Sequence, residues 1–265
     1  MLMKYRVNYP IDVFLTRLSN LTGVIAKLWI AVIVVAVSAC ASPETLESIH
    51  DPYEEMNRRT HALNKSLDKA LLKPASGVYA AIVPDELGTG IRNFAGYLDI
   101  PGEVANNLLQ FDLAGAATNS ARFVINGTVG ILGLYDAASE IGLYPDAADF
   151  GQTLHVWGVG EGAFVELPVL GASTERDAVG IAVDAVFNPM TLALPSEWKL
   201  AGIGAKTVSM VGDRARFATT VDSVLYESAD SYSQSRLYYL QSRRHELGMK
   251  PDEDDYFDPY EDIYE

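Results

Sequence analysis

The chain has 265 residues, 49% of them hydrophobic and 21% charged, a balance typical of a folded protein and not of a wholly disordered one. Its single cysteine excludes a scaffold held together by disulfide bonds. Because the formal net charge is −15, we expect no binding to nucleic acid, whose phosphates repel a polyanion.

The first 39 residues have the pattern of a targeting segment. They carry four basic residues against one acidic residue and end in an uncharged run of twelve, LWIAVIVVAVSA. Twelve residues match the apolar core of a signal peptide, whereas a spanning helix needs roughly 20. The string Val37-Ser38-Ala39-Cys40 resembles the lipobox of bacterial lipoproteins, which implies cleavage before Cys40 and lipid on its sulfur and new amino terminus. An uncleaved membrane anchor is the alternative.

After this signal peptide, residues 1–39, we expect a lipidated tether, one folded domain and an acidic tail. Residues 40–50 form the tether, and residues 51–250 show no repeat, linker or composition shift that would split them. The last fifteen residues, 251–265, contain eight acidic residues and no basic one. Such a run predicts a solvated, disordered tail, and the alternative is that its aromatic side chains dock a partner.

Apolar residues at helical spacing predict a first helix from Asp51, which ends before Pro74 because proline disrupts a helix interior. Further helices are predicted over 85–101, 101–111 and 112–126. Asn126-Gly127 is the expected C-cap of the last of these.

Two glycine-rich segments then interrupt the helical pattern. In the first, Gly127, Gly130 and Gly133 alternate with apolar residues, and the second covers residues 151–171. Neither has helical periodicity of useful length. Glycine at this density predicts unusual backbone dihedral angles or close backbone approach.

Helical patterns resume at Thr174, where the string T-E-R-D resembles a capping box. The apolar runs at 178–187 and 190–194 are too short to cross a bilayer, so each is either buried in protein or laid against acyl chains. Longer helices are predicted over 196–225 and 230–247. Because helices dominate the pattern, the predicted fold class is all-α, in a single domain.

Motifs for catalysis or metal binding are missing from the sequence. The four histidines include no pair three or four residues apart that one helix could present to a metal ion. No G-x-S-x-G string marks a hydrolase nucleophile, and the run from Gly158 to Gly162 lacks the lysine of a phosphate-binding loop. We therefore expect no enzyme, no catalytic residue, no metal and no cofactor.

Five ordered blocks of sequence resemble the MlaA (also called VacJ) family of outer-membrane lipoproteins. The first opens with Asp51-Pro52-Tyr53-Glu54 and continues to Asn57-Arg58, and the second reads V-A-N-N-L-L-Q at 104–110. The other three blocks cover residues 121–138, 149–180 and 235–244. The block at 149–180 is the most specific of the five.

This resemblance implies a ring-like helical domain with short membrane-embedded or interfacial helices and glycine-rich loops around an amphipathic channel. Family members remove mislocalised phospholipids from the outer leaflet of the outer membrane and pass them to a periplasmic carrier. The implied partners are phospholipids, a trimeric outer-membrane porin and a periplasmic lipid-carrier protein. The implied location is the periplasmic face of the outer membrane, anchored at Cys40. The alternative is a structural adaptor lipoprotein that docks porins or envelope proteins without transporting lipid.

The family blocks also nominate individual residues. The residues expected to tie the first helix to the body of the domain are Asp51, Pro52, Asn57 and Arg58. The candidate hinges of a gate loop are Gly127, Gly130 and Gly133, for which close packing or a tight turn is the alternative explanation. The remaining family-motif residues are Asn106, Asn107, Gly151, Gly158, Gly160, Pro168 and Arg176.

Overall fold

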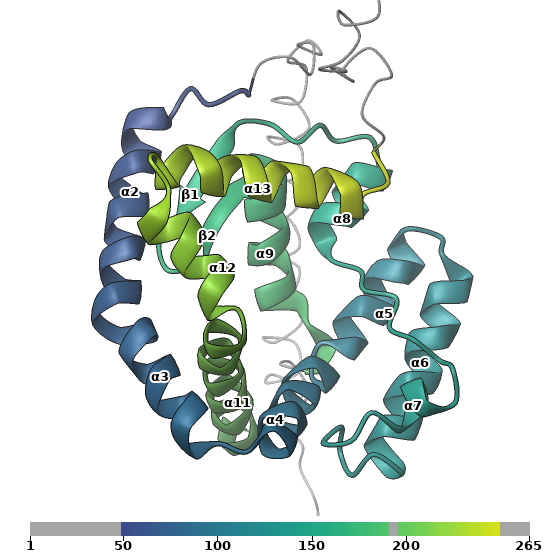
Figure 1. Cartoon of the computed structure of the whole chain (residues 1–265). Coiled ribbons are helices and arrows are strands. Elements are labelled where there is room, and N and C mark those ends of the chain that lie inside the picture. The colour runs from purple at the N-terminus through teal and green to yellow at the C-terminus, as the bar shows by residue number, and fades with distance from the viewer. Residues whose placement is uncertain (1–48, 191–195, 250–265) are drawn as a thin grey trace, which may run out of the picture. The chain divides into compact units, whose positions relative to one another are not determined.

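Figure 1 shows the computed structural model, which describes residues 49–190 and 196–249. The chain divides into two compact units, residues 1–45 and 46–265, and every described residue belongs to the second. The predictions for the signal peptide, for Cys40, for the second short apolar run and for the acidic tail concern residues that lie wholly or mostly outside the described ranges.

The described residues form helices and one short hairpin. The helices before the hairpin are α2 (Glu54–Leu67), η1 (Asp68–Leu72), α3 (Lys73–Ile82), α4 (Asp85–Tyr97), α5 (Ile100–Leu109), α6 (Leu113–Thr128), α7 (Ala137–Glu140) and α8 (Phe150–Val156). The hairpin and later helices are β1 (Phe164–Leu167), β2 (Gly171–Thr174), α9 (Glu175–Phe187), α11 (Ser196–Arg216), α12 (Ala218–Asp222), η2 (Ser223–Glu227) and α13 (Ser231–Glu246). The mostly helical fold class is confirmed.

The first helical stretch is longer than the sequence predicted. Instead of ending before Pro74, the chain passes through the π-helical segment η1 into α3. Because Leu72 before α3 is itself helical, Pro74 lies inside a continuous helical stretch, just after η1, where its missing N–H interrupts the hydrogen-bond pattern. The chain bends between α2 and α3 without leaving the helical conformation (Figure 1).

Two further local predictions need correction. Asn126-Gly127 does not cap α6, which continues to Thr128, because the Asn126 side chain is buried and bonded to Asp136. The glycine-rich segment from residue 151 begins within a short helix, α8, since Asp149 caps its start by accepting a hydrogen bond from the Gln152 N–H.

The same segment also holds the hairpin, which sequence periodicity missed because each strand has only four residues. Strand β1 pairs antiparallel with β2, from Phe164 opposite Thr174 to Leu167 opposite Gly171. The predicted cap at Thr174 is confirmed: its hydroxyl accepts a hydrogen bond from the Asp177 N–H at the start of α9.

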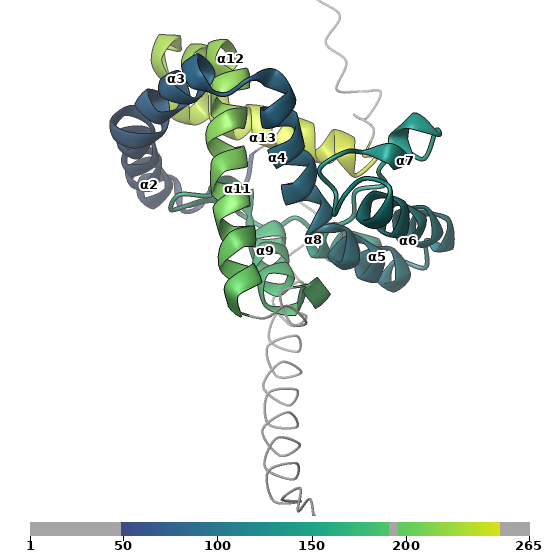
Figure 2. The ribbon, with the colours of Figure 1, turned by 90° about the horizontal axis from the view of Figure 1, so that it is seen from below.

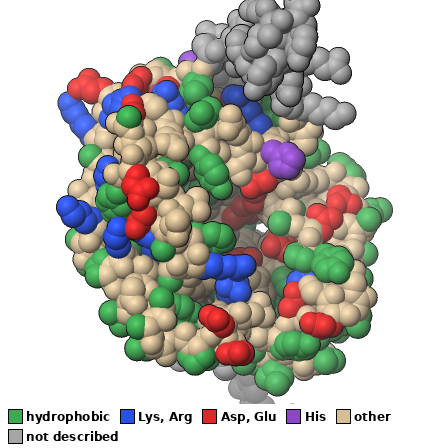
Figure 3. Space-filling model, viewed as in Figure 1, with side chains coloured by type: hydrophobic (Ala, Val, Ile, Leu, Met, Phe, Trp, Pro, Cys, Tyr) green, Lys and Arg blue, Asp and Glu red, His purple; other side chains and the backbone are tan. Residues whose placement is uncertain are grey.

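Contacts between the elements form a closed cycle. β1 packs on α2, α2 continues through η1 to α3, α3 packs on α11 and α11 on α4. From α4 the contacts pass to α6, α5, α8 and α9, and α9 returns to β1 (Figures 1 and 2). The small apolar core, Phe164, Tyr232 and Leu240, lies between the hairpin and α13. Figure 3 shows a face of the molecule that is hollowed, with acidic side chains at the edge of the hollow.

Candidate functional site

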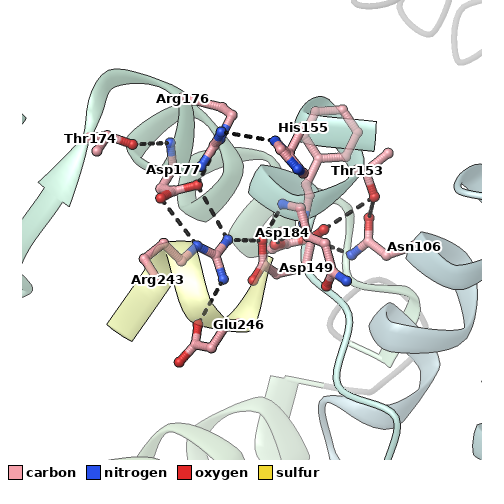
Figure 4. A network of polar contacts seen from close by, with 12 residues as sticks. Asn106, Asp149, Thr153, His155, Thr174, Arg176, Asp177, Asp184, Arg243 and Glu246 are labelled. Carbon is pink, nitrogen blue, oxygen red and sulfur yellow. Dashed lines mark hydrogen bonds and ion pairs between the residues drawn. The ribbon is translucent and has the colours of Figure 1, made fainter. Parts of the chain in front are cut away.

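A polar network joins α8, α9 and α13 beside the hairpin (Figure 4). At its centre the Asp177 carboxylate accepts hydrogen bonds from Tyr239 Oη at 2.7 Å, Arg243 Nε at 3.2 Å and Arg176 Nε at 3.2 Å. Arg243 also donates to Asp149 Oδ1 at 2.7 Å. Both sides of the Arg243 guanidinium are therefore held by carboxylates, and the network fixes three helices to one another.

Close approach of two backbones makes this network possible. A Cβ atom added to Gly151 would lie 2.5 Å from Asp177 Oδ1, and one added to Gly180 would collide with the Gly151 backbone. Helices α8 and α9 therefore cross at these two glycines. The crossing brings Asp149, at the start of α8, and Asp177, at the start of α9, to the same arginine.

A second set of hydrogen bonds extends the network to α5. Asn106 Nδ2 donates to Asp184 Oδ1 at 3.0 Å, and Thr153 Oγ1 donates to Asn106 Oδ1 at 3.1 Å. The Phe150 N–H donates to the other Asp184 oxygen at 2.9 Å. Asn106, a family-motif residue, thus connects α5 to α8 and α9.

The environments of Asp177 and Asp184 move their pKa values in opposite directions. Burial opposes the charge of Asp177, but hydrogen bonds from Tyr239 and Arg243 outweigh it, so the pKa of Asp177 is lowered. Burial raises the pKa of Asp184, and its hydrogen bond from Asn106 does not cancel that effect. Both carboxylates line a cavity of about 240 Å³.

Arg176, another family-motif residue, is buried at 4% exposure. Its Nη1 lies 3.5 Å from the Nδ1 of His155, and its Nη2 has no hydrogen-bond partner among the described residues. Burial lowers the pKa of His155, and the positive charge of Arg176 lowers it further. His155 is therefore held neutral beside a buried cation.

The opening motif holds α2 against the hairpin and α13. Asn57, 1% exposed, donates to Asp51 Oδ1 at 2.9 Å and to the Phe164 carbonyl at 3.0 Å, and accepts from the Glu166 N–H at 2.9 Å. Arg58 reaches both carboxylate oxygens of Asp230, at 3.1 Å and 2.9 Å.

The other residues of these motifs are scattered. Asp51 also pairs with Arg236 of α13, and Asn107 accepts a hydrogen bond from Asn119 Nδ2 at 2.9 Å. Several nominated family-motif residues are prolines or glycines and add no polar side chain to the network. They are Pro52, in the exposed turn before α2, Gly158 and Gly160, after α8, and Pro168, in the hairpin turn.

The three candidate hinge glycines lie at the end of α6, where Gly127 is in the last helical turn, and in the turn that follows, which contains Gly130 and Gly133. A Cβ atom on Gly127 would lie 2.6 Å from Tyr97 Oη, and one on Gly130 or Gly133 would collide with its neighbours. Gly133 also has a φ of +83°, a conformation that favours glycine. Close packing restricts the backbone at Gly130 and Gly133, whereas at Gly127 the nearest atom is the end of the Tyr97 side chain.

The same turn exposes apolar side chains. Ile131 and Leu132 have φ angles of 53° and 57°, left-handed conformations that are costly for bulky residues. Their side chains are 67% and 52% exposed. The strained turn is held at its base by Asp136, which accepts hydrogen bonds from Arg122 Nη2 at 3.1 Å and Asn126 Nδ2 at 2.8 Å.

Sequence reasoning missed the carboxylates that organise this region. Asp136 and Asp149 each precede a helix and accept a hydrogen bond from its first turn, which is a signal readable from sequence. Their arginine partners, Arg122 and Arg243, carry no such local signal, because the pairings depend on the tertiary fold.

Exposed apolar side chains are also distributed over the helices. Those more than half exposed include Val78, Ile82, Phe111, Val124, Leu200 and Ile203. Over residues 49–190 and 196–249, no helix combines the length and hydrophobicity needed to cross a membrane.

Comparison with known proteins places this geometry in context. A family model described as MlaA lipoprotein matches residues 49–246. A protein of Rickettsia bellii is 33% identical over 196 residues, which cover 74% of this chain and 76% of the relative. The intermembrane phospholipid transport system lipoprotein MlaA of Escherichia coli (strain K12) is 32% identical over 213 residues, or 78% and 82% of the two chains.

A solved structure agrees with these relatives. It is described as "Structural basis for maintenance of bacterial outer membrane lipid asymmetry". It superposes on this chain with a TM-score of 0.65 and 31% sequence identity, covering 74% of this chain and 98% of the other. The chain is therefore similar to it in both sequence and fold.

Proposed function

This chain belongs to the MlaA lipoprotein family, and from that premise we propose that it removes mislocalised phospholipids from the outer leaflet of the outer membrane and passes them to a periplasmic carrier. Transport is retrograde and maintains lipid asymmetry. The observation that carries the proposal is the closed cycle of contacting elements together with a hollowed face edged by acidic side chains (Figure 3).

The physical task is to move a polar headgroup without exposing it to hydrocarbon. A headgroup buried without partners costs several kcal/mol, roughly 2–7 for a single neutral polar group. A polar lining inside a cycle of helices offers such partners, while apolar side chains outside meet acyl chains. No bond is made or broken, so the proposed activity is transport and not catalysis.

The anchor and the domain organisation belong to the same proposal. Residues 1–39 direct export, lipid on Cys40 holds the protein at the periplasmic face of the outer membrane, and residues 51–250 form the transport domain. One acyl chain anchors a protein only marginally, whereas two or three hold it durably. A trimeric porin is the proposed scaffold, and a soluble lipid carrier the proposed recipient.

The segment from Gly127, in the last turn of α6, to Gly133, in the turn that follows, is the proposed gate, with Gly127, Gly130 and Gly133 as hinges. Ile131 and Leu132 in this segment are exposed and have left-handed backbone conformations. Such strained conformations often occur in segments that move during function, which supports the proposed gate. Alanine at each glycine should raise phospholipid at the cell surface. Gly77→Ala is the control, because nothing lies within 4 Å of the added Cβ. Wild-type behaviour of the three variants at normal protein abundance would rule out the gate.

Deleting the gene tests the function itself. Phospholipid on the outer leaflet should rise, and the wild-type gene should restore it whereas Cys40→Ala should not. If the deletion leaves surface phospholipid unchanged, the transport proposal fails and the adaptor lipoprotein replaces it.

A further inference from the structure

A second cavity, of about 460 Å³, lies where α3, α4 and α11 meet. Small-molecule sites typically have volumes of about 300–1,000 Å³, so the space suits a small polar group. Its wall carries four formal charges: Asp85 and Arg92 from α4, and Asp213 and Arg216 from α11. It shares no lining residue with the cavity beside Asp177.

The two arginines of this cavity differ from the other arginines that the structure describes. Each of the others forms an ion pair with a carboxylate: Arg58, Arg59, Arg122, Arg176, Arg214, Arg236, Arg243 and Arg244. Within the described ranges, Arg92 donates only to Thr89 Oγ1, at 3.2 Å, and the Arg216 guanidinium lies only near the Phe217 ring, 5.4 Å from its centroid. Two guanidinium groups without a carboxylate partner among the described residues therefore share one cavity.

The third wall of the cavity is Tyr79 from α3. Its ring is close to two glycines, because a Cβ atom would lie 2.8 Å from Tyr79 Oη if added to Gly88 and 3.0 Å if added to Gly212. The hydroxyl makes no hydrogen bond to any described residue. The Tyr79 ring, whose hydroxyl has no hydrogen-bond partner among the described residues, thus lines the cavity together with two acidic and two basic side chains.

These groups match one kind of ligand. Guanidinium groups bind phosphate oxygens through paired, charge-assisted hydrogen bonds. Carboxylates and a tyrosine ring bind an ammonium group, by ion pairing and by cation–π attraction respectively. Because the wall carries as many acidic as basic groups, it suits a zwitterion better than a simple anion.

We propose that this cavity binds the phosphate–ammonium headgroup of a zwitterionic phospholipid. Arg92 and Arg216 hold the phosphate, and Asp85 and Asp213 hold the ammonium. The inference rests on the proposed transport function for the source of the lipid, and it names the headgroup class that the protein prefers. The same helices expose apolar side chains that suit acyl chains, among them Val78, Ile82 and Leu87, which are 59%, 71% and 56% exposed.

Binding to the purified, lipidated protein in detergent tests the site directly. The probes are short-chain phosphatidylethanolamine, short-chain phosphatidylglycerol and inorganic phosphate. We expect phosphatidylethanolamine to bind most tightly, and the double variant Arg92→Gln/Arg216→Gln to weaken it by at least about tenfold. Arg59→Gln is the matched control, because among the described residues Arg59 pairs only with exposed Glu55, and this variant should bind as wild type does.

Further variants separate the effect of positive charge from that of the paired guanidinium hydrogen bonds. Arg92→Lys/Arg216→Lys keeps the charge but loses the paired hydrogen bonds, so it should bind with intermediate affinity and reports on the site even if the glutamine variant folds poorly. Asp85→Asn/Asp213→Asn should reduce the preference for phosphatidylethanolamine over phosphatidylglycerol.

Several outcomes would overturn the site. Unchanged lipid affinity in both arginine variants would exclude the cavity, and tight binding of inorganic phosphate with no added affinity for lipid would make the ligand a free phosphate. These binding results are independent of the gene-deletion assay. If the gene deletion does not raise surface phospholipid but the purified protein still binds lipid selectively, the transport function is rejected and the binding site is kept.

Discussion

Two regions of the molecule use their charges in different ways. In the polar frame, defined as α2, β1, β2, α8, α9 and α13, buried arginines and carboxylates are paired across elements, as Arg243 is with Asp177. In the arm, defined as α3, α4 and α11, helices approach at glycines such as Gly88 and Gly212. There the pair Lys206–Asp99 is exposed, and Arg92 and Arg216 have no carboxylate partner among the described residues.

The difference separates structural charges from available ones. Removing a charge from water costs several kcal/mol unless a partner compensates it, so the buried charges of the frame have to be paired for the chain to fold. A paired guanidinium offers a ligand fewer free N–H groups than an unpaired one. The arm has a buried ion pair, between Arg214 of α11 and Asp68 of η1, whereas Arg92 and Arg216 at its cavity have no carboxylate partner among the described residues.

Asp177→Ala should produce the largest effect on stability. It leaves Arg176 and Arg243 buried without their shared partner, which costs about 3–5 kcal/mol of unfolding free energy. Denaturant unfolding in detergent measures it, with Glu55→Ala as the control because Glu55 is 86% exposed. Equal effects of the two changes would break the distinction between frame and surface charges.

Glu103 on α5 is a half-buried carboxylate without an ion pair among the described residues, so it tests whether a partly buried charge needs a partner. Burial and the negative charge of Asp99 raise its pKa to about 7, although Arg122 acts in the other direction. The carboxylate therefore destabilises the fold above pH 7, and that penalty disappears as the pH falls from 7 towards the unfolded value of 4.5.

Glu103→Gln should accordingly stabilise the protein at pH 8, by up to about 3 kcal/mol, and have little effect near pH 4.5. The measurement is the difference in unfolding free energy between variant and wild type across this range. A difference that does not change with pH would show that Glu103 ionises normally.

Asn57→Ala tests whether the hydrogen bonds of a buried amide side chain stabilise the polar frame, as its ion pairs do. The change removes hydrogen bonds to Asp51 and Phe164 and leaves the Glu166 N–H without its acceptor, so we expect a loss of roughly 1–3 kcal/mol. Asn93→Ala is the control, because Asn93 makes one long bond of 3.4 Å to the Leu134 carbonyl. A smaller loss for Asn57→Ala than for this control would contradict the proposed role of the opening motif.

The smallest effect is expected in the arm. Lys206→Met removes the exposed pair with Asp99 and should cost at most about 1 kcal/mol, because solvent screens the interaction. Arg243→Met makes the corresponding change in the frame and should cost several times more. Thermal unfolding of the two variants side by side would sharpen the comparison, and similar losses would refute it.

Several parts of the fold could be predicted from local sequence. The helix start at Thr174 and the last helix follow from a capping pattern and apolar spacing, and both are confirmed. The passage of the helix through Pro74 and the hairpin at 164–174 could not, because neighbouring elements stabilise them. A four-residue strand has too few residues for its periodicity to stand out.

The sequence by itself determined the helical class and the family, because the first depends on residues that are near in the chain and the second on ordered blocks. The exported leader stays a prediction. The tertiary structure alone decided which charges are paired. Arg243 meets Asp149 and Asp177 only because α8 and α9 cross at glycines, and Arg92 and Arg216 line one cavity only because α4 packs on α11. These contacts depend on how distant segments pack, and no local pattern encodes that.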